Sequence, residues 1–204
     1  MSKPSPSVEQ KNIAPLMTTI IVIVAAIAIV SGGFKMFSGV QKIASSSSDP
    51  KVDLLLKDSD VALDEANKQN QIVVPAFQQL LNDFDQLGVE SFRKEKREVS
   101  DNLVAQFAKT TGQFQMAAKK LDAAAILSVD KKLNAFIVIK SKSYGLLGNV
   151  CDQNAEIIRV LLDDSLVDSA AITEKVLKLA ASRDATQKAA NDATTEADVI
   201  MKGT

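Results

Sequence analysis

The sequence predicts an all-α protein, in which a single N-terminal transmembrane helix is followed by an elongated antiparallel (up-down-up-down) four-helix bundle. Two observations support this fold class. Residues 13–34 form one uncharged run that is rich in Ile, Val and Ala. After this run, apolar residues recur at helical spacing along the chain, and only a few short breaks interrupt the pattern.

The apolar run is long enough for a membrane-spanning helix. Such a helix needs roughly 20 apolar residues, because each adds about 1.5 Å across a hydrocarbon core about 30 Å thick. We expect an uncleaved signal-anchor at residues 13–34; a cleaved signal peptide and a buried helix are the alternatives. Cleavage is disfavoured because Glu9 lies in the leader and because no small-x-small pattern directly follows the run.

Charge indicates the orientation of the chain. In residues 1–44, four Lys against one acid give +3, and in residues 45–204, twenty bases against twenty-four acids give −4. This difference favours a cytoplasmic N-terminus and a single-pass protein whose helical domain is extracytoplasmic, either periplasmic or extracellular. We expect a disordered tail at 1–12, the signal-anchor at 13–34, an interfacial segment and Ser-rich tether at 35–49, and the bundle domain at 50–204.

Short breaks divide the bundle into segments of similar length. Asp49-Pro50 is a favourable helix entrance, because Asp caps a helix and Pro is tolerated in its first turn. Gly88 is suited to a helix end, and Ser and Asp residues follow the later segments. The predicted helices cover 50–87, 89–127, 129–164 and 168–202, with coiled-coil-like apolar stripes that include Val73, Phe77, Leu80, Phe84, Phe92, Val99, Leu103, Phe107, Phe114, Phe136, Ile137, Tyr144, Leu147, Ile172, Val176 and Leu179.

The residue inventory argues against an enzyme. The chain has no histidine, which removes the most common general base and metal ligand and excludes nucleophilic triads that depend on one. Cys151 is the single cysteine, and we expect it to be a buried apolar residue. There is no Gly-rich phosphate loop. We therefore expect no catalytic site, no metal and no cofactor.

Two groups of residues are candidates for binding a partner. The first is a charged cluster that we expect at the tip of the bundle far from the membrane, with solvated surface as the alternative: Glu90, Arg93, Lys94, Lys96 and Arg97. The second is a face of small residues in the apolar run that would allow helix pairing: Ala25, Ala28 and Gly32. Nucleic acid is not expected, because the basic residues are interleaved with acids and lack stacking aromatics.

These observations predict a membrane-tethered structural or adaptor protein. It would be an accessory subunit of a membrane or envelope complex, with the lipid bilayer at residues 13–34 and a protein partner or a second copy at the bundle. In arrangement alone, the layout resembles the four-helix extracytoplasmic sensor domains of bacterial chemoreceptors, which implies an alternative function as a small-ligand sensor. In that case Pro75, Gly145 and Gly148 would distort the helices to form a pocket.

Overall fold

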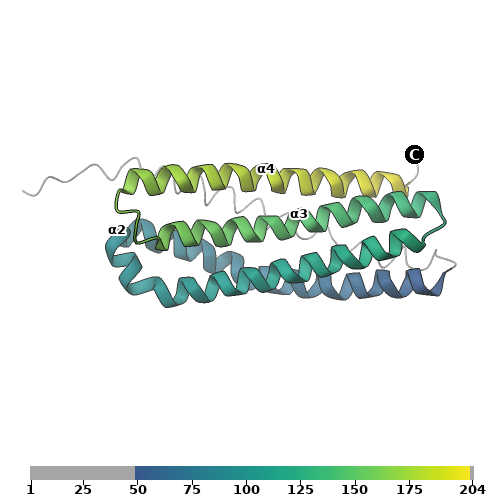
Figure 1. Ribbon diagram of the computed structural model, residues 1–204, viewed down its shortest axis with the longest axis horizontal. Helices are drawn as coiled ribbons and strands as arrows, with labels where there is room; N and C mark the ends of the chain where they lie inside the picture. Colours follow the sequence, from purple (N-terminus) through teal and green to yellow (C-terminus); the bar gives the residue numbers. More distant parts are fainter. Residues whose placement is uncertain (1–48, 203–204) are drawn as a thin grey trace, which may run out of the picture.

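The computed structural model describes residues 49–202, which form three helices and contain no strand. Helix α2 spans Pro50–Leu127, α3 spans Lys131–Leu162 and α4 spans Ser169–Lys202. Figure 1 shows that α2 runs the length of the molecule, bends and returns alongside itself, and that α3 and α4 lie along it. The beginning of α2 and the C-terminal end of α4 lie at one end of the molecule, and the bend lies at the other.

The prediction of four helices is wrong, because the first predicted break does not separate two helices. Helix α2 continues through Leu87-Gly88-Val89 as one element of 78 residues. At Gly88 its backbone has φ 72° and ψ 171°, which lie outside the helical region and which residues other than glycine rarely adopt. This conformation bends the helix sharply. We call residues 50–87 the first arm of α2 and residues 89–127 its second arm.

The prediction of a transmembrane helix is also corrected. None of α2, α3 and α4 is long and apolar enough to cross a membrane, because charged residues recur along each of them. The predicted span at 13–34, the predicted tail at 1–12 and residues 35–48 of the predicted tether lie outside the described residues. The fold class for the described part is therefore three helices without a membrane-spanning one.

Aspartate side chains set two of the helix starts. Asp49 accepts a hydrogen bond from the amide of Lys51 at 2.8 Å, and Pro50 occupies the first helical position, as predicted. Helix α3 begins two residues later than expected, because Asp130 caps it by accepting from the amide of Leu133 at 2.8 Å.

The apolar stripes of the three helices form one continuous core. Phe77 and Phe107 from the two arms of α2 meet edge to face, with ring centroids 5.6 Å apart. Most of the stripe residues named above are buried, but Val99 is 58% exposed and does not belong to the core. Core residues from every helix include Val73, Phe77, Leu80, Phe92, Leu103, Phe114, Phe136, Tyr144, Ile172 and Val176.

Small polar side chains bring neighbouring helices close together. Ser59 Oγ donates to the carbonyl oxygen of Ala117 at 3.0 Å, which joins the two arms of α2. Ser143 Oγ donates to the carbonyl oxygen of Ala190 at 2.9 Å, which joins α3 to α4. Because each hydroxyl bonds a backbone carbonyl of the facing helix, these sites satisfy buried polar groups while they hold the helices in register.

Gly88 and Gly112 form a matched pair for testing the bend. Gly88→Ala is expected to lower the free energy of unfolding by about 1–3 kcal/mol, because alanine is strained at this φ and ψ. Gly112 is exposed within a regular part of α2, and no atom lies within 4 Å of a Cβ added there. Gly112→Ala is therefore expected to raise stability by about 0.5–1 kcal/mol. Urea unfolding followed by circular dichroism measures both, and equal effects would contradict the role assigned to Gly88.

Candidate functional site

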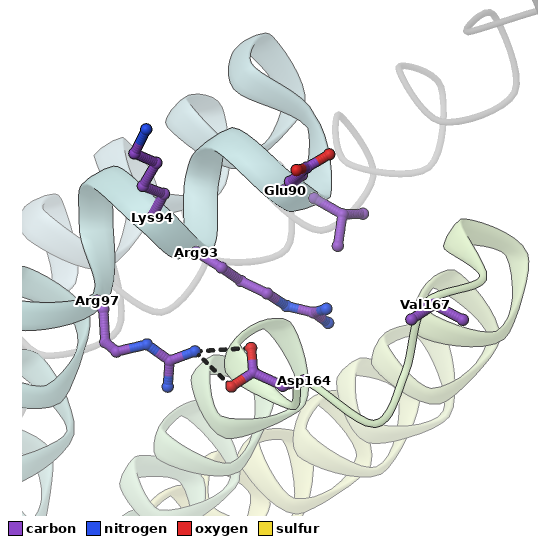
Figure 2. A pocket seen from close by; sticks show the side chains of 7 residues that line it. Glu90, Arg93, Lys94, Arg97, Asp164 and Val167 are labelled. Carbon is purple, nitrogen blue, oxygen red and sulfur yellow. Dashed lines mark hydrogen bonds and ion pairs between the residues drawn. The ribbon is translucent and has the colours of Figure 1, made fainter.

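An open hollow of about 490 Å³ lies at the end of the molecule where α2 bends. Figure 2 shows that the first turns of the second arm form one side of it and that the connection between α3 and α4 forms the other. The residues lining it are Val89, Glu90, Arg93, Lys94, Arg97, Asp164 and Val167.

Arg93 joins the two sides of this hollow. Its Nε donates to the carbonyl oxygen of Leu161 and its Nη2 to that of Leu166, both at 2.9 Å. Leu161 lies in the last turn of α3, where carbonyl groups lack helical donors and where the helix dipole favours a cation. The side chain of Arg93 therefore holds the α3–α4 connection against the second arm of α2.

Arg97 and Lys96 make ion pairs in different directions. Arg97 Nη2 contacts the two carboxylate oxygens of Asp164 at 2.7 and 2.8 Å across the hollow (Figure 2). Lys96 Nζ instead lies 2.9 Å from a carboxylate oxygen of Asp83 on the first arm. Burial opposes the charge on Asp83, but hydrogen bonds from Lys96 and Gln79 outweigh it and lower the pKa of Asp83. Lys96 therefore joins the arms of α2 and does not line the hollow.

Three side chains at the hollow are left available to a binding partner. Glu90 and Lys94 are exposed, and neither has a hydrogen bond or ion pair with another described residue. Val167, on the opposite side, is 84% exposed. Protein–protein interfaces commonly combine an apolar centre with a polar, solvent-accessible rim, and Val167 with Glu90 and Lys94 could supply these two parts.

The structure brings together four of the five residues predicted to form a charged tip. Glu90, Arg93, Lys94 and Arg97 line the hollow, whereas Lys96 does not. The sequence places Asp164 and Val167 in a polar turn but does not indicate that this turn contacts the second arm, because that contact is long-range. The predicted helix-pairing residues Ala25, Ala28 and Gly32 lie outside the described residues.

A second hollow, of about 600 Å³, lies along the side of α2, between its two arms. Two ion pairs around it connect the arms. Lys120 Nζ lies 2.8 Å from a carboxylate oxygen of Asp58, and Lys109 Nζ lies 4.0 Å from one of Glu65. Because these pairs link the two arms, we interpret this surface as part of the packing of α2.

Among the described residues, Asp60 is the carboxyl group whose pKa departs most from its ordinary value. Partial burial, followed by the charge of Asp64 one turn away, raises the pKa of Asp60 to about 6. Tyr144, buried on α3, has a raised pKa because of burial and because of the charges of Asp60, Asp198 and Asp64. This carboxyl-rich region therefore lies between α3, α4 and the first arm of α2.

Cys151 does not have the environment of a nucleophile. It is buried on α3, and its Sγ lies 3.7 Å from Oδ1 of Asn70 on the first arm. Burial, and secondarily the charge of Asp152, raise the pKa of its thiol, which suppresses the reactive thiolate. Within residues 49–202 there is no group of three Cys, Asp or Glu side chains placed to hold a metal ion.

No family, curated protein or solved structure matches this chain, so the interpretation of the site depends on its own residues.

Arg93→Met is expected to lower the free energy of unfolding by about 1–3 kcal/mol, because the substitution removes two hydrogen bonds from a charged donor. It is also expected to increase hydrogen exchange in residues 163–168. Arg97→Met is the control, because Arg97 has only an exposed ion pair with Asp164 and should cost about 0–1 kcal/mol. If the two variants unfold at the same urea concentration, Arg93 does not hold the connection.

Asp60→Asn is expected to raise stability at pH 7 by roughly 1 kcal/mol, after allowance for solvent screening. The folded-state pKa of Asp60 is above its unfolded value of about 3.8, so the folded protein loses stability as the pH rises from about 4 to 6. The Asp60→Asn variant should not show this pH-dependent decrease in stability. The decrease is measured from the urea midpoints of both proteins between pH 4 and 7, with Asp101→Asn, at an exposed position, as the control. A gain that is the same at pH 4 and pH 7 would contradict this assignment.

Proposed function

We propose that this chain is a non-catalytic adaptor that binds a protein partner at the bend of α2. The observation that carries the proposal is the hollow between the second arm and the α3–α4 connection. There, exposed Val167 and unpaired Lys94 lie beside arginine side chains that are already held in place. The proposal uses the described residues alone. The expected membrane location comes from residues outside them and stays a prediction.

The two sides of the hollow are held together by hydrogen bonds, and this rigidity supports its assignment as a docking site. Arg93 and Arg97 each bond groups on the α3–α4 connection, so the two sides are fixed before a partner arrives. A preorganised surface loses less conformational entropy on binding than a mobile one. This favours recognition of a partner whose own shape is complementary to the hollow.

The chemistry of the hollow favours a partner segment with an apolar side chain next to an acidic one. Val89 and Val167 supply apolar surface, and Lys94 supplies an unpaired positive charge. Three bases against two acids line the hollow, so its formal charge is +1. Charge complementarity of this kind contributes mainly to the association rate and to specificity.

The alternative function, a small-ligand sensor, has no specific observation in its favour. Helix α2 continues through Pro75, and α3 continues through Gly145 and Gly148. A Cβ on Gly148 would lie 3.6 Å from Phe114 Cβ, so this glycine serves close packing of α3 on α2. Neither of the two hollows is lined by these residues.

The test is affinity purification of the full-length protein after mild crosslinking in its native cells, with mass spectrometry of what it retains. The double variant Lys94→Glu, Val167→Asp is expected to reduce capture of a stoichiometric partner by roughly tenfold or more. The control is Lys119→Glu, Val138→Asp, which makes the same changes at exposed positions elsewhere. Undiminished capture by the first variant, or equal loss with the control, would contradict the docking site.

A further inference from the structure

The end of the molecule opposite the bend carries an apolar loop tip. Val129, in the connection from α2 to α3, is 90% exposed, and Ile126, in the last turn of α2, is 85% exposed; these are the two highest values among the large hydrophobic residues that the structure describes. Leu127 between them is also exposed. Lys131 and Lys132 follow directly and are exposed as well.

This loop lies at the end where the chain enters the described structure. Figure 1 shows the start of α2 and the α2–α3 connection at the same end. The apolar run at residues 13–34 precedes that entry by only 15 residues, 35–49. In sequence, the apolar run therefore leads into the end of the described structure that carries this loop.

We propose that residues 126–132, which comprise the end of α2, the connection and the start of α3 and which we call the α2–α3 loop, contact an anionic lipid surface. Ile126 and Val129 enter the boundary between headgroups and acyl chains, and Lys131 and Lys132 extend their ammonium groups to lipid phosphates. Asp130 does not oppose this arrangement strongly, because its carboxylate caps α3 by accepting from the amide of Leu133. The contact is peripheral and requires none of the described helices to cross the bilayer.

The other end of the molecule offers an internal comparison. Val167 is 84% exposed in the α3–α4 connection, so its exposure is close to that of Val129. Its surroundings differ, because Arg93 and Arg97, the nearby arginines of the hollow, already bond groups of this region, whereas Asp163, Asp164 and Asp168 place three carboxylates in the connection itself. An anionic lipid surface repels these carboxylates, so the proposal assigns lipid contact to one end of the molecule only.

The experiment compares an environment-sensitive fluorophore at the two ends of the full-length chain. Val129→Cys and Val167→Cys are each labelled with a nitrobenzoxadiazole dye and mixed with vesicles of phosphatidylcholine and phosphatidylglycerol. Cys151 is buried, so the unchanged protein serves as the labelling control and should stay unlabelled under native conditions. Nitroxide groups on the lipid acyl chains report which label reaches the bilayer.

The expected result is a shift of the emission to shorter wavelength, with nitroxide quenching, at position 129 and neither at position 167. Ile126→Gln in the Val129→Cys protein should reduce the quenching, and its unfolding midpoint should change little because position 126 is exposed and glutamine is a good helix former. A label at 129 that stays in water, or equal quenching at both ends, would overturn the proposal. This assay contains only protein and lipid, so its outcome is separate from that of the partner capture.

Discussion

The positive φ angle of Gly88 turns helix α2 back on itself, and the contacts between its arms depend on that reversal. Phe84 and Phe92, close on either side of the bend, meet edge to face with ring centroids 5.1 Å apart. Lys96 pairs with Asp83 just beyond them. Because the chain reverses without a loop, the start of the second arm lies at the very end of the molecule. This position brings Arg93 to the connection that follows α3.

The seam between α3 and α4 shows a different balance of forces. Small residues such as Ala190 and Ser143 allow a close approach, but two long cations are buried beside them. Lys140 Nζ lies 3.0 Å from a carboxylate oxygen of Asp198, and Arg183, which is fully buried, donates to Asp184. Burying charges costs free energy, which their pairing offsets only in part. The Lys140–Asp198 pair joins α3 to α4 and therefore contributes more to the register of α4 on α3 than to net stability, whereas Arg183 and Asp184 are neighbours on α4.

The two ends of the molecule differ in chemistry, and this difference unites the two proposed contacts. At the bend, bonded arginines and an unpaired lysine surround a hollow with an apolar edge. At the other end, the α2–α3 loop presents apolar side chains followed by two lysines. Three helices packed along their length separate these surfaces (Figure 1). A rod of this kind would hold a docking site at a fixed distance from a lipid surface, a geometry suited to an adaptor.

The sequence by itself determined the helical class, the entrance at Asp49 and most of the buried positions, because these follow from local capping and from helical periodicity. The sequence also indicated a break at Gly88, but whether this glycine ends a helix or bends one depends on how the flanking segments pack. Only the tertiary structure decided that Val99 is exposed, that Lys140 and Arg183 are buried, and that Arg93 bonds carbonyl groups some 70 residues away. The physical reason is that periodicity shows which face of a helix is apolar, whereas long-range packing decides which helix covers each part of that face.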